Sequence, residues 1–206
     1  MAIVINGSGT ITGISVGGLP DDIVDSGTLA TNSVDSAELI DGAIDAAHLA
    51  SGVGGKVVQI VNTQTAAVGS GTTVIPHNDT TPQITEGDEY MTLAITPTSA
   101  TNKLQIVANV WTNHSVANVI TIIALFVGTT ADALAATCGA LDTSALNVVN
   151  TTSLSYTMTS GSTSELTFRL RAGGHGAGTT TFNGFNGGAY FGTATSSSMT
   201  ITEIAV

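Results

Sequence analysis

The chain has 206 residues, of which 42% are hydrophobic and only 9% are charged, and its net charge at neutral pH is −11. This length is enough to bury one good hydrophobic core and predicts one or two domains. Four Lys and Arg stand against fifteen Asp and Glu, so a phosphate backbone would be repelled and we expect no nucleic-acid partner. Cys138 has no second cysteine to pair with, which excludes a disulfide framework, and we expect it to be a small buried hydrophobe.

The sequence also argues against membrane insertion. Its longest apolar run, VITIIALFV at 119–127, has nine residues, whereas a helix needs about 20 to cross a bilayer. The first residues, MAIVINGSGTITG, contain no basic region and no long hydrophobic stretch. We therefore expect no secretory signal, and folding in a reducing cytoplasm.

Residues 24–53 repeat in units of ten: VDSGTLATNS, VDSAELIDGA and IDAAHLASGV. The second place of each unit is Asp, and Asp35 with Glu38 three places on has the pattern of a capped helical turn. A fixed period indicates that each unit solves the same packing problem as its neighbour. The first and sixth places are aliphatic, and they hold Val24, Leu29, Val34, Leu39, Ile44 and Leu49.

One decad is too small to be stable in a single chain. Two or three buried aliphatic side chains contribute about 4–8 kcal/mol, while ordering ten residues costs roughly 10–15 kcal/mol. If the aliphatic residues of several chains meet around an axis, the burial free energy can exceed the cost of ordering. The repeat therefore predicts an oligomeric arm or stalk, with a threefold axis preferred. The alternative is a flexible acidic linker whose repeats are left over from duplication.

A domain boundary is predicted in the glycine-rich segment GVGGK, at 52–56. Residues 1–55 contain seven acidic residues, no Lys or Arg and no aromatic residue, and the first aromatic side chain is Tyr90. Such a shift in composition with clustered glycines is typical of a boundary. We expect residues 1–55 to form an extended arm that oligomerises and anchors the protein, and residues 56–206 to form a separate head.

The head shows the alternation of β-strands. Apolar and polar residues alternate in several segments, turn signals such as Thr96-Pro97 and Ser160-Gly161 separate them, and no long helix is evident. The fold class predicted is mainly β, with an antiparallel β-sandwich of the jelly-roll type. About eight strands are expected, at 57–61, 72–75, 91–95, 104–110, 119–127, 154–158, 166–170 and 198–206.

The strand at 119–127 breaks the alternation because it is apolar on both faces except at Thr121. Such a strand is expected to be covered on both sides. In a two-sheet sandwich only one face meets the core, so a neighbouring subunit is predicted to cover the other. The alternatives are an exposed strand and a long covering loop. The predicted contact residues are Val107, Trp111, Ile120, Ile122, Leu125 and Val127.

Few residues of the head suggest catalysis. Hydrolysis of a glycan requires two carboxylates held across a bond, and the segment ITEGDEY offers Glu86, Asp88 and Glu89. Neighbouring acidic residues in a turn are more often solvated charges, and the sequence has no nucleophile elbow, phosphate loop or zinc-protease motif. We therefore expect no enzymatic activity and predict no catalytic residue.

Metal and cofactor sites are not predicted either. The glycine-flanked His175 could meet its copies on a symmetry axis around a metal or an anion, but an ordinary loop histidine is the plainer interpretation. The acidic run at 21–25 lacks the calcium-loop pattern, although calcium held between subunits stays open. The four histidines show no ligand spacing; they are His48, His77, His114 and His175.

Four segments together resemble the small virion structural proteins of tailed bacteriophages: INGSGTITGISVGGLP at the start, the decads, TPTSATNKLQI at 96–106 and SMTITEIAV at 198–206. The motifs are loose and carry no catalytic or ligand residues. The resemblance implies a trimeric fibre or capsid-decorating protein, with a slender N-terminal part and a β-sandwich head similar to the jelly roll of tumour necrosis factor.

Two positions on the virion are compatible with this resemblance. A decorating protein would bind the major capsid protein, or another virion protein, through its arm. A short tail fibre would instead use its head to bind a glycan on the bacterial surface. The arm is short, and one Trp, three Tyr and five Phe are few for a receptor-binding head. We therefore expect a non-enzymatic homotrimer that decorates the capsid and is assembled in the host cytoplasm, with the tail fibre as the alternative.

Overall fold

The computed structural model describes residues 56–139 and 148–206. The six aliphatic residues of the arm, the acidic run and His48 lie outside these ranges, so the predictions made for them stay predictions. In the described residues there is no α-helix, and therefore none that could cross a membrane. The strands are β1 Val57–Thr65, β2 Gly69–Gly71, β3 Asp88–Ile95, β4 Lys103–His114, β5 Thr121–Val127, β6 Ala135–Cys138, β7 Val149–Thr159, β8 Leu166–Gly174, β9 Thr180–Phe182, β10 Gly184–Phe185, β11 Gly188–Ala189 and β12 Ser197–Ile204.

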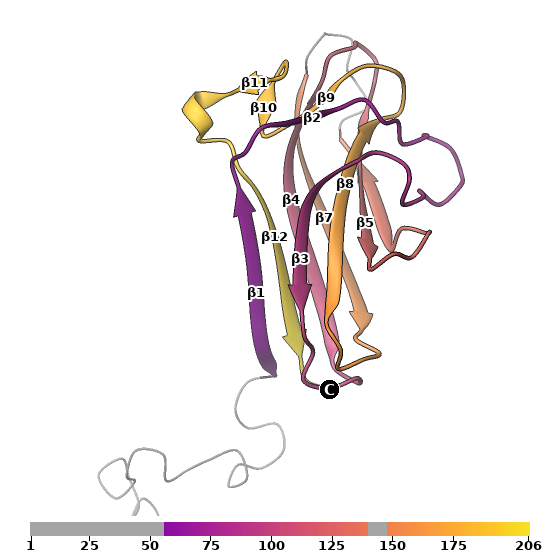
Figure 1. Ribbon diagram of the computed structural model, residues 1–206, viewed down its shortest axis with the longest axis vertical. Coiled ribbons are helices and arrows are strands. Elements are labelled where there is room, and N and C mark those ends of the chain that lie inside the picture. Colours follow the sequence, from indigo (N-terminus) through magenta and orange to yellow (C-terminus); the bar gives the residue numbers. More distant parts are fainter. Residues whose placement is uncertain (1–55, 140–147) are drawn as a thin grey trace, which may run out of the picture. The chain divides into compact units, whose positions relative to one another are not determined.

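The strands form two main antiparallel sheets that pack face to face (Figure 1). The larger sheet contains β1, β12, β4 and β7, with β9 and β2 added beside the end of β4. The smaller sheet has the order β3-β8-β5-β6, and β10 and β11 form a separate hairpin. The mainly-β antiparallel sandwich predicted from the alternation is therefore confirmed.

Strand pairing follows a nested order along the chain. The first long strand, β1, pairs with the last, β12, and inside this pair β3 pairs with β8, β4 with β7 and β5 with β6. One predicted strand is absent, because 72–75 runs outside both sheets. There Thr73 bonds to the Asp88 carboxylate, and Ile75 is fully buried against the smaller sheet.

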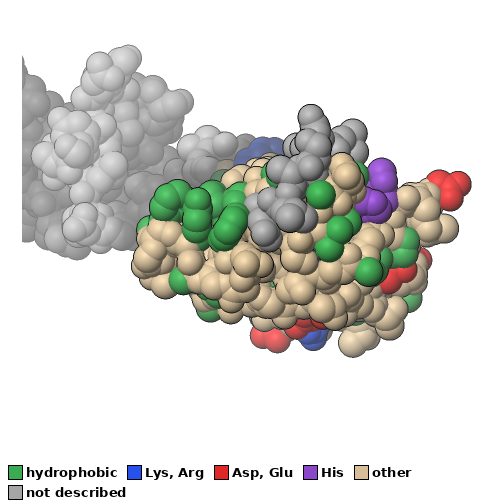
Figure 2. All heavy atoms as spheres, turned by 90° about the horizontal axis from the view of Figure 1, so that it is seen from above, with side chains coloured by type: hydrophobic (Ala, Val, Ile, Leu, Met, Phe, Trp, Pro, Cys, Tyr) green, Lys and Arg blue, Asp and Glu red, His purple; other side chains and the backbone are tan. Residues whose placement is uncertain are grey.

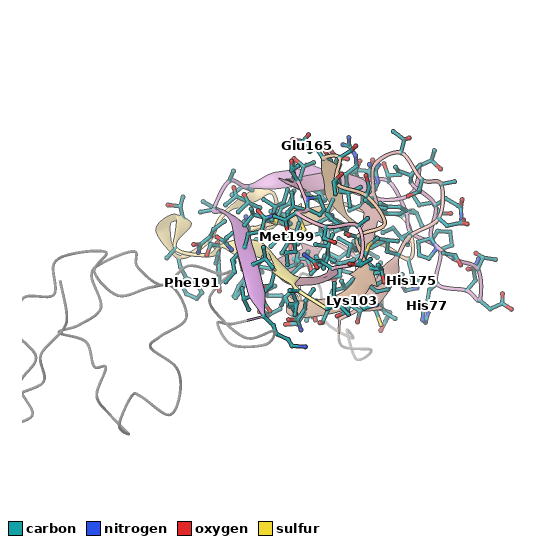
Figure 3. The ribbon with its side chains drawn as sticks, turned by 90° about the horizontal axis from the view of Figure 1, so that it is seen from below. His77, Lys103, Glu165, His175, Phe191 and Met199 are labelled. Atoms are coloured by element: carbon teal, nitrogen blue, oxygen red, sulfur yellow. The ribbon has the colours of Figure 1, made fainter. Side chains whose placement is uncertain are left out.

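The core lies between the two sheets. Alternate residues of each strand point inward, and the set includes Met199, which Figure 3 shows inside the molecule. Leu125 is fully buried here, and Val127 packs against the same cluster. Leu125 therefore has no surface to offer a second copy.

The outer face of β5 is covered as well, and the cover comes from the same chain. Ile122, Ala124 and Phe126 form a second buried cluster with Ile75, and Ile84, Ala133 and Cys138 pack onto it. Ile120, just before β5, is also buried. The strand is thus covered on both faces, as expected, but by a long loop, the alternative left open above. Because the chain itself covers β5, this strand gives no reason to expect a neighbouring subunit on its outer face.

A buried carboxylate closes the end of the sandwich where the described chain begins and where it ends (Figure 1). Glu203 on β12 is 0% exposed. Its Oε1 accepts hydrogen bonds from the Thr98 N–H and Oγ1 and from Asn102 Nδ2, and its Oε2 accepts one from Gln59 Nε2. Burial opposes ionisation, but these hydrogen bonds outweigh it and lower the pKa of Glu203 to about 2. The network joins two of the segments that carried the phage resemblance, 96–106 and 198–206.

Candidate binding surface

Two surfaces of the head stand out, and the first is the outer face of the larger sheet. Its four long strands expose mainly Ser, Thr, Asn and Gln, so we call it the Ser/Thr face. From β1 to β7 its residues are Val58, Ile60, Asn62 and Gln64; Ser198, Thr200, Thr202 and Ile204; Lys103, Gln105, Val107, Asn109 and Trp111; and Thr151, Ser153, Ser155, Thr157 and Thr159.

Strand register aligns these side chains in rows across the sheet. Asn62 Nδ2 donates to Thr200 Oγ1, Ser153 Oγ donates to Asn109 Oδ1, and Lys103 Nζ donates to Thr159 Oγ1. Lys103 is the one charged residue of the Ser/Thr face. Ile60 is 61% exposed and Val58 is 42% exposed, which leaves aliphatic groups at its β1 edge. The face is thus nearly uncharged, with its polar groups partly paired.

Two of the predicted contact residues lie on this face. Val107 is partly exposed at its middle, between Thr200 of β12 and Ser155 of β7. Trp111 is partly exposed at the end of the same row of β4. The structure thus separates the predicted contact set, because Val107 and Trp111 face outward while Ile120, Ile122 and Leu125 are buried within one chain. Whether a second copy contacts Val107 and Trp111 stays a prediction.

The second surface is a group of aromatic side chains, which we call the aromatic patch: Trp111, Phe185, Tyr190 and Phe191. Ring centroids of Phe185 and Tyr190 are 5.4 Å apart and stacked, those of Tyr190 and Phe191 are 4.2 Å apart, and Trp111 lies 6.5 Å from Phe191. Phe191 is 68% exposed and Phe185 is 37% exposed. These rings therefore contact one another and solvent rather than the core.

The patch lies at the far end of the sandwich from Lys56. β10 and β11 are at the top of Figure 1, and Figure 2, which looks down on that end, shows hydrophobic side chains gathered on their side of the molecule. Figure 3 places Phe191 on the opposite side from His77 and His175. The described part of the chain therefore enters the head at one end and presents its aromatic rings at the other.

A tight hairpin and a left-handed turn hold the rings. Asn186 and Gly187, between the paired residues Phe185 and Gly188, have φ of 48° and 79°, as the two central residues of a type I′ turn require. Phe191, Gly192 and Thr193 follow with φ of 46°, 62° and 73°. Each non-glycine residue in the left-handed region costs roughly 1–2 kcal/mol. The loop therefore holds Phe191 in a strained backbone conformation.

Asn183, fully buried, anchors the base of this loop. Its Nδ2 donates to the carbonyls of Thr65 and Ala67, and its Oδ1 accepts from Ser197 Oγ. Its backbone N–H donates to the Trp111 carbonyl. Asn183 thus ties the aromatic loop to β1 and β12 through its side chain and to β4 through its backbone. The Trp111 Nε1 atom is buried and has no hydrogen-bond partner among the described residues.

The three acidic residues of ITEGDEY have structural partners. Glu86 Oε2 accepts from the Gln83 N–H, Asp88 accepts from Thr73, and Glu89 forms ion pairs with Arg169 and Arg171 on the outer face of the smaller sheet. The arginines also donate to the carbonyls of Gly128, Glu86 and Gly87. These groups connect the covering loop to the sheet.

The histidines of the head gather loosely near one end without forming a metal site. The rings of His77 and His175 are 5.9 Å apart, and His175 Nδ1 accepts a hydrogen bond from the Ile120 N–H. Burial, with the nearby His175, lowers the pKa of His114 below its ordinary value. Residues 56–139 and 148–206 contain no group of three His, Cys, Asp or Glu that could hold a metal ion. A shallow pocket of about 260 Å³ between His77 and Cys138 has no Asp, Glu, Lys or Arg among its lining residues.

Sequence reasoning missed the aromatic patch. The Asn186-Gly187 dipeptide is a strong hairpin signal and could have located β10 and β11. Four of the aromatic residues that looked sparse in the sequence are brought together by this hairpin. Nothing in the sequence pairs Trp111 with Phe191, which are 80 residues apart.

No protein-family model and no curated protein matches this chain. Among solved structures it is similar to that of the infectious bursal disease virus Gt strain, at 12% identity and a TM-score of 0.36 over 73% of this chain and 39% of that chain. The VP2 subviral particle of the same virus matches at 12% identity and 0.30 over 73% and 39%, and dimeric latent PorU from Porphyromonas gingivalis at 8% and 0.35 over 75% and 14%. The chain thus spans less than half of each of these chains. At such identities and TM-scores these matches assign neither a family nor a function.

Proposed function

We propose that this protein is a non-enzymatic structural component of a phage virion, a homotrimer that decorates the capsid through its N-terminal arm. The nested strand pairing supports a jelly-roll head, because a jelly roll is a long antiparallel hairpin wrapped into two sheets, with first strand against last and innermost strands against each other. The phage identity rests on the sequence segments quoted above.

The observation that carries the oligomer is the Ser/Thr face. A monomer in water usually keeps charged side chains on an exposed sheet face, and a protein-protein contact is depleted of charge at its centre. The Ser/Thr face has one charged residue, Lys103, exposes Val58 and Ile60, and partly exposes Val107. Covering it would therefore remove apolar surface from water with almost no charge to desolvate. A threefold axis would close such contacts into a ring.

Light scattering tests this assembly. The purified full chain should have three times the 20.6 kDa mass of one copy. Val107→Lys places a charge at the middle of the Ser/Thr face and should lower the mass toward that of the monomer. The matched control is Thr92→Lys, at an exposed position of β3 in the smaller sheet, which should stay trimeric.

The outcomes separate the two parts of the proposal. A stable wild-type monomer would reject the trimer. A trimer unaffected by Val107→Lys would assign assembly to the arm alone and reject the Ser/Thr face. Deleting residues 1–55 should abolish incorporation into virions, and electron microscopy of intact particles would locate the head on capsid or tail.

A second candidate function is that of a tail fibre whose head binds the host surface. The aromatic patch favours it, because exposed Phe191 and Phe185 are available anchors at the end of the head farthest from Lys56. Purified protein should then adsorb to host cells and block infection. Absence of adsorption at micromolar protein would leave decoration as the function.

A further inference from the structure

We propose that the aromatic patch is a binding site for a neutral saccharide. This inference deepens the second candidate function and rests on it, because it locates the ligand site on the head and specifies that the host-surface glycan is neutral. Four rings with partly exposed faces and edges lie together, and two of them, Phe185 and Tyr190, are stacked. One face of a pyranose ring carries mostly C–H groups, which pack on an aromatic ring and leave the hydroxyl groups at the edge for hydrogen bonds.

Polar groups beside the rings suit those hydroxyl groups. The exposed side-chain amide of Asn186 has no hydrogen-bond partner among the described residues, while its backbone N–H is fixed by Asn113 Oδ1. An amide offers both a donor and an acceptor, as a sugar hydroxyl requires. A site with aromatic walls and a few placed polar groups is typical of small-molecule recognition.

Charge argues for a neutral ligand. No Asp, Glu, Lys or Arg occurs between Arg171 and Glu203, the segment that supplies Phe185, Tyr190 and Phe191. The chain as a whole carries a net charge of −11. An anionic polysaccharide, a nucleic acid or an anionic membrane would meet repulsion and find no nearby cation to pair with.

The strained backbone at Phe191 indicates that this residue has a role in binding rather than in stabilising the fold. Phe191 has φ of 46° and remains 68% exposed, so its side chain contributes little burial in return for the left-handed conformation. Strained residues persist where the surrounding structure holds them, and they cluster at binding and catalytic sites. Here the buried side chain of Asn183 fixes the base of the loop. The ring of Phe191 is thereby preorganised for a ligand.

The size of the patch favours a saccharide over a second copy of the chain. A stable protein-protein contact buries about 800 Å² on each partner. A fully buried aromatic side chain accounts for about 150–250 Å². In this patch Phe191 is 68% exposed and Phe185 is 37% exposed, while Trp111 and Tyr190 are exposed less. The exposed area therefore matches one or two sugar rings.

The test uses the full chain and its single tryptophan, Trp111, which belongs to the patch. Neutral oligosaccharides of glucose, galactose and N-acetylglucosamine are titrated while Trp111 fluorescence is recorded, and the same sugars are presented on an array. We expect saturable binding to at least one of them. We expect the Phe191→Ala variant to bind it at least about tenfold more weakly, and the matched control Val206→Ala, exposed at the other end of the head, to bind it unchanged.

A second variant separates binding from folding. Phe191→Gly relieves the left-handed conformation, so its thermal stability should equal or exceed that of the wild type while saccharide binding is lost. Cells that adsorb the wild type and the patch variants equally would overturn the saccharide site and leave the host-binding function standing. Loss of trimer mass in Phe191→Ala would identify a second copy as the occupant and overturn the proposal. Absence of binding to every sugar would also overturn it.

Discussion

The two sheets of the head share one core, but their outer faces differ in composition and in what covers them. The smaller sheet is covered by its own chain, with Ile75 packed on the outer side of β5. Its remaining outer surface carries Arg169, which donates to the Gly128 carbonyl, and Arg171, which donates to the Glu86 carbonyl of the covering loop. The larger sheet has no such cover, and its Ser/Thr face exposes hydroxyl, amide and aliphatic groups with one lysine. The outer face of the smaller sheet is occupied by a loop of the same chain, whereas the outer face of the larger sheet is available for contacts with another molecule. This difference is the reason we propose the larger sheet as the assembly surface.

The largest effect is expected from removing the cover of the smaller sheet. Ile75→Ala deletes a fully buried side chain that touches the outer side of β5, and such truncations destabilise by about 2–5 kcal/mol. Urea denaturation should show this loss with an unchanged slope. Because the Ser/Thr face is untouched, the folded fraction should keep the trimer mass. A loss of less than 1 kcal/mol would mean that the loop does not seal the sheet.

The next effect concerns Glu203, which connects the segment after β3 of the smaller sheet with β1 and β12 of the larger one. Glu203→Gln keeps the shape but sets an amide N–H against the donors of Gln59, Thr98 and Asn102, and we expect a loss of roughly 2–3 kcal/mol at pH 7. Thermal denaturation measures it. The control Glu165→Gln, in the exposed turn before β8, should change stability little.

Glu203 also sets a pH dependence with a defined sign. Its pKa in the folded protein is about 2, below its ordinary value. A carboxylate of this kind stabilises the fold fully above its unfolded pKa, and the contribution is lost as pH falls toward the folded value. Wild-type stability should therefore decline between about pH 4.5 and pH 2, and the Glu203→Gln variant should decline less over that range. Parallel curves for the two proteins would contradict the network.

Sequence patterns located most of the strands because the alternation of inward and outward residues is visible within a few consecutive residues. Leu104, Ile106 and Ala108 recur at every second position and lie in the core, so period two was enough to place β4. The doubly apolar strand around Ile122 was also recognised correctly as covered on both faces. Its covering residue Ile75 was assigned to a strand instead, because a short apolar segment has the same appearance in a strand and in an extended loop.

The surface sites depend on contacts between residues that are far apart in the sequence, and such contacts cannot be inferred from a single sequence. Trp111 meets Phe191 only because Asn183 folds the hairpin back onto β4. Glu203 meets Gln59 through the register of β1 and β12, and it contacts Thr98 and Asn102 in the segment between β3 and β4. Val107 and Trp111 were placed outward by alternation alone, whereas Leu125 was assigned to a contact although alternation with Ile123 turns it into the core.

The variant with the smallest expected effect on stability gives the most selective test of the difference between the outer faces of the two sheets. Ile60 on β1 is 61% exposed, so Ile60→Thr, which keeps a β-branched strand former, should change single-chain stability by less than about 0.5 kcal/mol. If a second copy covers the Ser/Thr face, each of three contacts loses apolar area, and the trimer should dissociate at roughly tenfold higher protein concentration. The reverse change Thr92→Ile adds an aliphatic group to the smaller sheet, which is not expected to assemble, and should leave dissociation unchanged. Dilution followed by light scattering distinguishes these results, and equal dissociation for Ile60→Thr and the wild type would show that β1 faces solvent in the assembled protein.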